Sequence, residues 1–535
     1  MSKQAEFKVR VEGRLLWHLL FWLTVIALLD QSRFLFSYPV PDTGMWFGDE
    51  TWTMLTVRAM ARTGVACVPE ALGSSLAHSN GFVNGSIWLS GLCYGIPASL
   101  LPAYATPVEI GRIVTFAFSL LLLLCVYRLT RQVTDSPVLS LIATFLLTLS
   151  NAFYFSSHSA RLDMVTGLSV MLGCWLFLRV YRVSQVSVGN DLRHWYFLVP
   201  LIVILSLAVY VHAPTLLLLP ALYTLWRCGA IRNLRGSIIV ALGGGVGLLL
   251  LLVPYYFTNG SMTLLGKGYN QYYNVAYSLP ILHPFSLQVQ KINTVDRAIQ
   301  VSQVAWPILV GLAIGLVSNR FYRGRASSAG RFFIALTALS VAAWMLAEGP
   351  AVFYNIHILP LLAITAAILL SEVVNRHATS RRFQWSLALG AIILTTSTIL
   401  HQESLGRAGL RFTSDNNIAI HALIQPVVSA QRPPLILTDQ PALNHIAGME
   451  GVRLMTNHLL LFGEENKPLP DILLEKGVDY LLLYSTAKWQ SPFRHIADSL
   501  YTLVGQQTGT LTDQARSYDK PMWNEIDTLR LYKAR

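Results

Sequence analysis

Residues 111–131, GRIVTFAFSLLLLLCVYRLTR, decide the fold class of this chain. The segment has no charged residue between Arg112 and Arg128, and similar apolar runs of about 17–25 residues, the length of a membrane-crossing helix, recur along the chain. Of the 535 residues, 53% are hydrophobic and 13% are charged, whereas soluble proteins carry about 25% charged residues. The sequence therefore predicts an α-helical polytopic membrane protein.

Hydropathy predicts about eleven transmembrane helices. They cover residues 15–36, 111–129, 137–156, 164–181, 195–210, 212–227, 236–257, 303–318, 331–347, 352–371 and 383–400. Residues 195–227 could instead form one long helix that is kinked at Pro214. The first segment is expected to stay as an anchor, because no small-residue cleavage site follows its basic flank.

Arginines predict which loops face the cytoplasm. With the N-terminus inside, every inner loop is basic, as Arg131, Arg182, Arg227 and Arg376 illustrate, while the outer turn 347–351 has no basic residue. This pattern explains much of the net charge of +12 without a nucleic-acid partner. We expect a protein of the inner (plasma) membrane with a cytoplasmic N-terminus.

Three parts are then predicted outside: the long loop 37–110, the loop 258–302 and the C-terminal tail. The tail alternates strand-like segments (PLILTD, VRLMT, DYLLLY, DTLRLYKA) with helical ones (PALNHIAGM, DILLEKG, FRHIADSLYTLV). The sequence thus divides into a transmembrane domain, residues 1–401, and a small α/β domain, residues 402–535. The second domain is expected in the periplasm or outside the cell.

The first outer loop carries an acidic pair, Asp49 and Glu50, within WFGDETWTML (46–55). Two helical stretches of this loop are expected to lie at the membrane interface, because Trp52, Trp88 and Tyr94 suit the headgroup level. The pair could be loop charge or a helix cap. Its aromatic neighbours favour a functional site, since they would hold the acids against an apolar surface.

A second candidate region is the outer turn SSHSARLDMVTG (156–167). It carries His158, Arg161 and Asp163, and Asp163 stands at the start of the fourth predicted span. One interpretation is an N-cap, because a helix N-terminus favours a carboxylate. The other is that Arg161 and Asp163 face the same outer cavity as Asp49.

Further ionisable side chains fall at outer ends of spans. His212 follows Tyr210 in VYVHAP, and Tyr354 and His357 lie in VFYNIHILP. Each histidine could simply pack in the core. Ionisable groups at membrane depth are nevertheless costly and tend to face a cavity or a partner, and all of these map to one side.

Two other patterns suggest no chemistry. The glycines of ALGGGVG (241–247) lie inside an apolar span, so Gly243 and Gly247 predict close helix packing rather than a phosphate loop. The five cysteines show no metal-ligand spacing.

Three stretches resemble the GT-C superfamily of polytopic glycosyltransferases: FGDETW (47–52), residues 111–131, and SARLDMVTGLSVMLGCW (159–175). They match the acidic pair after the first span, the arginine that begins the second span, and the Arg-x-Asp region of the next outer turn. Within the superfamily, the chain looks most like the protein O-mannosyltransferase and lipid A aminoarabinose transferase type.

The resemblance implies a polyprenyl-phosphate sugar donor in the membrane. It implies that Asp49 is the catalytic base, that Glu50 supports it, and that Asp163 is a second acidic site residue. A carboxylate would take the proton of an acceptor hydroxyl as that oxygen attacks the sugar, and polyprenyl phosphate would leave. Developing phosphate charge needs cations. The outer-side candidates are Arg161, Arg112 and Lys267.

The sequence also departs from this family. It lacks the β-trefoil repeats of eukaryotic protein mannosyltransferases, which argues against a protein acceptor, and the Trp-Trp-Asp signature of oligosaccharyltransferases, which argues against en bloc transfer. The acceptor stays open among glycan, lipid and protein. Participation of a divalent cation stays open too. Alternative functions are a transporter or flippase of a lipid-linked saccharide, and a ligase of surface polysaccharide. A transporter would normally contain internal repeats, and the two halves of this sequence show none.

Overall fold

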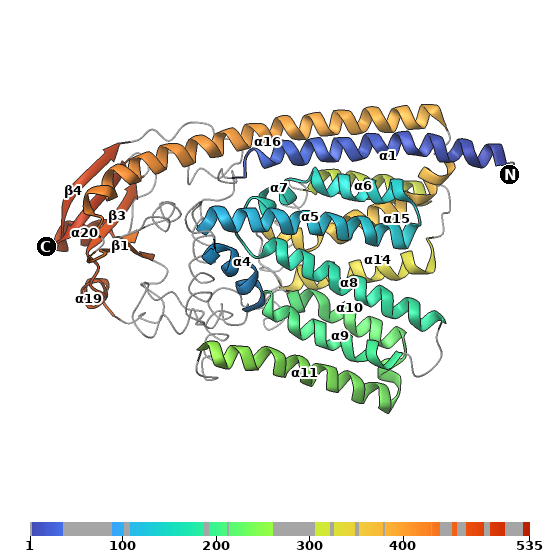
Figure 1. The fold of residues 1–535 in the computed structure, drawn as a ribbon, viewed down its shortest axis with the longest axis horizontal. Coiled ribbons are helices and arrows are strands. Elements are labelled where there is room, and N and C mark those ends of the chain that lie inside the picture. Colours follow the sequence, from blue (N-terminus) through green and yellow to red (C-terminus); the bar gives the residue numbers. More distant parts are fainter. Residues whose placement is uncertain are drawn as a thin grey trace.

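The structure is a computed structural model. It describes residues 3–35, 88–100, 107–186, 192–210, 213–259, 305–320, 326–347, 352–377, 380–429, 431–438, 452–456, 467–485, 493–508 and 528–535. Within these ranges the chain forms a bundle of roughly parallel and antiparallel helices and a small sheet that lies beyond one end of the bundle (Figure 1).

Within the described residues, each predicted span coincides with one helix or with two consecutive helices. The helices are α1 (Lys3–Ser32), α4 (Trp88–Leu100), α5 (Pro107–Thr134), α6 (Pro137–Thr148), α7 (Asn151–Ser157), α8 (Asp163–Val186), α9 (Arg193–Leu205), α10 (Ala213–Arg227), α11 (Leu234–Asn259), the helix Ala305–Arg320, α14 (Ser328–Ala347), α15 (Leu359–His377) and α16 (Arg381–Ile424). Residues 195–227 form two helices, α9 and α10, which pack against each other. The predicted class, an α-helical polytopic membrane protein with a small C-terminal α/β domain, is confirmed.

Length and composition identify the spanning helices. In the described part of the chain, six helices are long and apolar enough to cross a membrane, and the bent pair α6 and α7 makes a seventh if it counts as one span. Three shorter apolar helices cover Arg193–Ala208, Ala305–Arg320 and Leu359–Val374.

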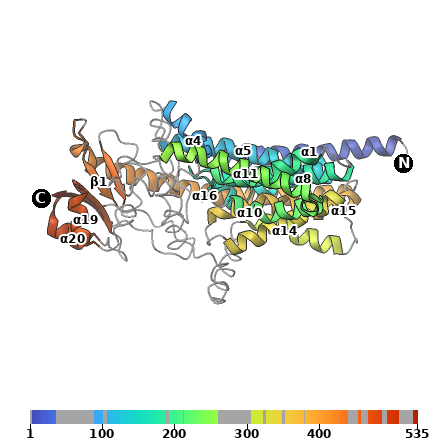
Figure 2. The same ribbon diagram turned by 90° about the horizontal axis from the view of Figure 1, so that it is seen from below.

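The two ends of the bundle differ. We call the end from which α16 continues to the sheet the domain end; the N-terminus lies at the opposite end (Figures 1 and 2). Helices α5, α8 and α15 all start at the domain end, so Arg131, Arg182 and Arg376 lie toward the other one. The arginines that predict the cytoplasmic side thus gather away from the sheet, as the sequence prediction requires.

The third predicted span is broken. Helices α6 and α7 meet at an angle of 70°, because Ser150 ends one helix and caps the next. Its hydroxyl donates to the Leu147 carbonyl at 2.7 Å and accepts from the Phe153 N–H at 3.3 Å. Such side-chain bonds compete with the helix ladder and bend it.

The tenth span also starts differently from the prediction. Residues Val352–His357 form a 3₁₀ turn (η4), and the α-helix begins only at Leu359. Pro360 accounts for this start, because proline is tolerated in the first turn of a helix and not inside it.

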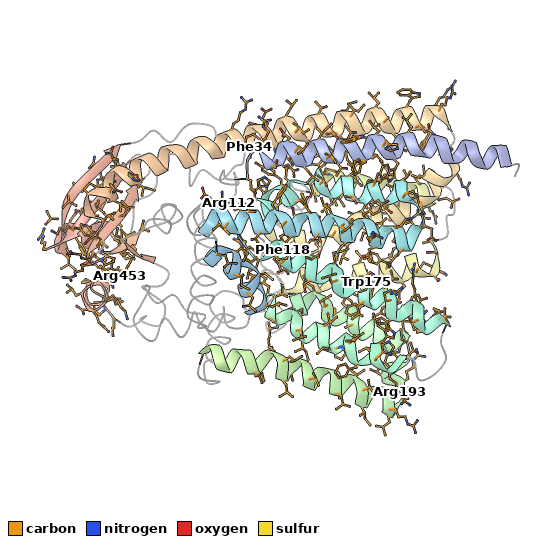
Figure 3. All side chains as sticks on the ribbon, viewed as in Figure 1. Phe34, Arg112, Phe118, Trp175, Arg193 and Arg453 are labelled. Atoms are coloured by element: carbon orange, nitrogen blue, oxygen red, sulfur yellow. The ribbon has the colours of Figure 1, made fainter. Side chains whose placement is uncertain are left out.

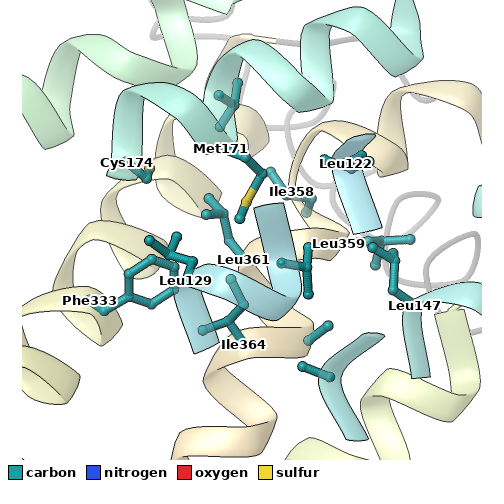
Figure 4. Packing of buried hydrophobic residues seen from close by; sticks show 14 of the residues in the cluster. Leu122, Leu129, Leu147, Met171, Cys174, Phe333, Ile358, Leu359, Leu361 and Ile364 are labelled. Carbon is teal, nitrogen blue, oxygen red and sulfur yellow. The ribbon is translucent and has the colours of Figure 1, made fainter. Parts of the chain in front are cut away.

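The centre of the bundle is where α5, α8 and α15 meet. Leu122 and Leu129 of α5 pack there with Met171 of α8 and with Leu361 and Ile364 of α15, all of them buried (Figure 4). In the apolar part of α8, 78% of the residues are buried, whereas in the apolar parts of the outer helices α11 and α16 the share is 22%. Helix α8 is therefore the central one, and it begins at Asp163.

Glycines bring α11 against α9, as predicted. A Cβ on Gly243 would lie 2.1 Å from the Phe197 carbonyl oxygen, and one on Gly247 would lie 3.1 Å from the Ile204 Cβ. Small residues at such a crossing let two membrane helices approach closely. The packing interpretation of this glycine-rich stretch is confirmed.

In the described part of the C-terminal domain, the sheet has five strands, β1 (Leu435–Thr438), β2 (Arg453–Thr456), β3 (Tyr480–Ser485), β4 (Tyr501–Thr508) and β5 (Thr528–Ala534), in the order β2-β1-β3-β5-β4. Strands β1, β2 and β3 are parallel, and β5 pairs antiparallel with β3 and β4. Helices α19 (Leu469–Glu475) and α20 (Arg494–Leu500) contribute Ile472, Leu473 and Ala497 to the hydrophobic core of this sheet domain.

One segment of this domain was predicted wrongly. The helix expected over FRHIADSLYTLV ends at Leu500, and β4 begins at Tyr501. Pairing with β5 overrides the helical pattern, and the Tyr501 hydroxyl donates to the Val478 carbonyl at 3.1 Å. Burial raises the pKa of Tyr501 to about 12, and the charge of Asp479 adds to the shift.

The α9–α11 contact yields a prediction for stability. Replacing Gly243 by Ala places a methyl group against the Phe197 carbonyl and should cost about 1–3 kcal/mol, the usual range for overpacking. Gly245 is the matched control, since its Cβ meets nothing within 4 Å. In detergent, Gly243→Ala should lower the thermal midpoint and Gly245→Ala should not. Equal midpoints would contradict the packing.

Candidate functional site

Three charged or polar side chains meet at the domain end of the bundle. The Arg161 Nε lies 2.7 Å from Asp163 Oδ2, and His357 Nε2 lies 3.3 Å from Asp163 Oδ1. Their side chains are 6%, 2% and 0% exposed. Asp163 therefore bonds to Arg161 through one carboxylate oxygen and lies close to His357 with the other, inside an apolar bundle, and we call these three residues the charge cluster.

Local structure explains how the charge cluster forms. Asp163 is the first residue of α8, where the helix dipole favours a negative charge, and Arg161 lies in the turn that joins α7 to α8. His357 ends η4, which lies close to α8 because Gly167 has no side chain: a Cβ there would be 3.0 Å from the Ile356 carbonyl oxygen.

His158 links this region to α1. Its Nε2 lies 2.7 Å from the Gln31 carbonyl oxygen, and its Nδ1 lies 2.7 Å from the Tyr154 carbonyl oxygen. The Gln31 side chain donates to the Thr148 carbonyl and to Gln402 Oε1 of α16, at 3.0 Å each. His158 is thus part of a buried polar connection between α1, α7 and α16.

Tyr94 of α4 reaches the same region, contrary to its predicted place at the headgroup level. It is fully buried, its hydroxyl lies 2.8 Å from Thr115 Oγ1, and it donates to the Arg161 carbonyl at 3.1 Å. Its ring packs near that of Phe118 of α5, with centroids 6.0 Å apart. A hydroxyl with buried polar partners explains why this tyrosine turns inward.

Two further residues complete the described surroundings. Arg112 lies on α5 toward the domain end and is 3% exposed (Figure 3), within electrostatic reach of His158. The Tyr210 ring lies edge-on to the His357 ring, with centroids 6.5 Å apart.

The structure thus brings five of the predicted site residues to one end: Arg112, His158, Arg161, Asp163 and His357. Four others, Asp49, Glu50, His212 and Lys267, lie outside the described residues. Tyr354 belongs to η4 by its backbone, and its side chain is outside the described part.

Sequence reasoning missed Tyr94, Gln31 and Gln402 as residues of this region. Gln31 and Gln402 are 371 residues apart, and neither stands in a recognisable motif. A buried tyrosine on an apolar helix also looks the same in sequence as one at the membrane interface.

The charge cluster holds the Arg161 guanidinium, a cation, in a fixed orientation. Asp163 holds Arg161 by a charged hydrogen bond, and such bonds are stronger than neutral ones. Burying the ions costs several kcal/mol before pairing, and ionisable groups at membrane depth usually mark a functional site. In the described part of the chain, no group of three or more His, Cys, Asp or Glu residues is placed to hold a metal ion.

Comparison with solved structures identifies the fold. ArnT from Cupriavidus metallidurans, bound to undecaprenyl phosphate, matches with a TM-score of 0.58 over 96% of this chain and 97% of that one, at 11% identity. The chain has the GT-C fold. Apo ArnT from the same organism matches with a TM-score of 0.52 at 14% identity over 96% and 97% of the two chains.

A second protein with the GT-C fold gives the same result. The apo oligosaccharyltransferase of Archaeoglobus fulgidus matches with a TM-score of 0.51 at 13% identity, over 94% of this chain and 75% of that one. No protein-family model matches the sequence, and no curated protein matches it either. The likeness is thus one of fold.

Breaking the charge cluster should be costly. Asp163→Asn removes the carboxylate that faces Arg161 and should lower the free energy of unfolding by about 3–5 kcal/mol, since the buried guanidinium loses its 2.7 Å contact with a negative charge. Thermal or denaturant unfolding in detergent measures this. The control is Glu475→Gln, which removes an exposed bond to Lys467 and should leave the midpoint unchanged. Similar losses in the two variants would contradict the buried pairing.

Proposed function

We propose that this protein is a glycosyltransferase that moves a sugar from a polyprenyl-phosphate donor to an acceptor hydroxyl at the domain end of its membrane helices. The observation that carries the proposal is the buried charge cluster at that end of a GT-C fold. An oriented, water-excluded guanidinium is suited to a phosphate whose charge grows as the sugar departs.

The reaction would proceed as a single displacement. Asp49 takes the proton of the acceptor hydroxyl, and the acceptor oxygen attacks the anomeric carbon. The bond between that carbon and the phosphate oxygen breaks, and polyprenyl phosphate leaves with the bonding electron pair. Attack opposite to the leaving group inverts the anomeric centre. Glu50 supports the base or contacts the acceptor.

The remaining site residues divide by charge. Arg161, Arg112 and Lys267 would neutralise the phosphate. Asp163 Oδ2 accepts the Arg161 Nε–H bond at 2.7 Å, which favours a role in orienting Arg161 over one in proton transfer. The donor and acceptor contacts would come from His212, Tyr354 and His357, whereas the predicted site residue His158, with both ring nitrogens 2.7 Å from main-chain carbonyl oxygens, would hold α7 against α1.

The fold neighbours support the donor class. ArnT is known bound to undecaprenyl phosphate, a polyprenyl phosphate of the kind that the reaction would release. The acceptor is a glycan, a lipid or a protein. The enzyme would lie in the inner (plasma) membrane, with the N-terminus in the cytoplasm and residues 402–535 on the outer side.

Asp49→Asn tests the proposed base. General-base catalysis is worth about 10²–10⁴-fold, so this variant should lose that factor in the release of polyprenyl phosphate while keeping its elution profile in gel filtration. The assay supplies purified protein in detergent with a polyprenyl-phosphate sugar and candidate acceptors. Gly245→Ala, which changes an open position of α11, is the matched control and should stay active.

The same preparation separates the enzyme from a flippase. Reconstituted into vesicles, a flippase would move lipid-linked saccharide between leaflets, and it would do so with Asp49→Asn as well. Scrambling that survives this substitution, together with no release of polyprenyl phosphate from the wild type, would contradict the proposed function.

A further inference from the structure

Tyr94 holds three elements together through one hydroxyl group. It comes from α4, it lies 2.8 Å from Thr115 Oγ1 of α5, and it donates to the carbonyl oxygen of Arg161 in the turn between α7 and α8. The side chain is fully buried. Because a Phe would fill nearly the same volume, the hydroxyl needs an explanation beyond packing.

The bonded carbonyl belongs to the residue whose side chain matters most in the charge cluster. Arg161 and Asp163 are two residues apart, so the orientation of the Arg161 backbone sets where its Nε meets Asp163 Oδ2, at 2.7 Å. Within the turn itself, the Arg161 N–H donates to the Ser159 carbonyl at 2.7 Å, so the Tyr94 bond acts on a residue whose two main-chain polar groups are both held.

The surroundings of the hydroxyl strengthen its bonds. Buried apolar side chains enclose Tyr94, and hydrogen bonds gain strength where water is excluded. The enclosing residues are Ile110, Ala160, Leu162, Val165 and Val209.

The face of α4 that points away from Tyr94 is apolar and exposed. Leu89, Leu92, Ile96 and Leu100 recur at helical spacing on α4 and are all exposed. Apolar residues exposed on one side and a buried tyrosine on the other place α4 between the surrounding lipid and the charge cluster.

We propose that Tyr94 is a positioning residue, which fixes the Arg161 guanidinium through the Arg161 carbonyl and so sets the geometry for the departing phosphate. This inference rests on the proposed function. On this account, α4 keeps the Arg161 side chain in place beside the phosphate. Loss of the Tyr94 hydroxyl should then lower kcat/KM by more than its effect on stability explains.

Tyr94→Phe tests the proposal, with Tyr196→Phe as the matched control. The Tyr196 hydroxyl donates to the Cys228 carbonyl at 2.6 Å, near the end of the bundle opposite to the charge cluster. Both substitutions remove one bond from a tyrosine to a main-chain carbonyl. Because Tyr94→Phe also removes the contact with Thr115 Oγ1, the thermal midpoint in detergent should fall in both variants, and further in Tyr94→Phe.

The kinetic results should differ. In the polyprenyl-phosphate release assay, Tyr94→Phe should lower kcat/KM about tenfold, the value of one buried hydrogen bond in the transition state. Tyr196→Phe should keep the wild-type value. In an Arg161→Lys background, adding Tyr94→Phe should cost nothing further, because the planar group that Tyr94 orients is gone.

Three results would overturn the inference. Equal kinetic losses in Tyr94→Phe and Tyr196→Phe would reduce Tyr94 to a packing residue. Additive losses in the Arg161→Lys background would show that Tyr94 acts independently of Arg161. No release by the wild type would overturn the proposed function itself and is recognised before any variant is compared.

Discussion

The rest of the structure depends on the burial of one ion pair, Arg161 with Asp163. Removing a charge from water costs several kcal/mol, and only close partners of opposite charge or hydrogen-bonding groups offset that cost. The local irregularities of the bundle supply those partners. The break between α6 and α7 precedes the turn that carries Arg161, and η4 replaces the first turn of a helix so that His357 meets Asp163. Gly167 lets η4 approach, and Tyr94 holds the turn from the other side.

The C-terminal domain is tied to this region by a single long helix. Helix α16 runs from Arg381 to Ile424 without interruption, so the predicted boundary between residues 401 and 402 lies inside it. Its far end contacts the sheet, where a Cβ on Gly505 would lie 2.9 Å from a methyl carbon of Leu423. Nearer the bundle, Gln402 bonds to Gln31, whose carbonyl lies against His158. The domain is therefore positioned over the end that carries the charge cluster.

Sequence alone predicted what depends on local pattern. Apolar run length predicted the helices, alternation predicted four of the five strands, and the positions of Arg161, Asp163 and His357 relative to the spans predicted that they share one end. It could not predict contacts between distant residues: the Gln31–Gln402 bond spans 371 positions, and the inward turn of Tyr94 depends on Thr115 and on a carbonyl. Strand β4 was missed for the same reason, because pairing with β5 overrides its local helical pattern.

One-sided turnover in proteoliposomes tests most directly whether the charge cluster serves sugar transfer at the domain end. Vesicles with uniformly oriented protein, whose sheet domain is located by protease digestion, would receive lipid-linked donor in both leaflets and a water-soluble acceptor on one side only. Transfer should occur when the acceptor is on the side of the sheet domain and not when it is on the side of the N-terminus. Transfer from the N-terminal side would contradict this assignment of the site.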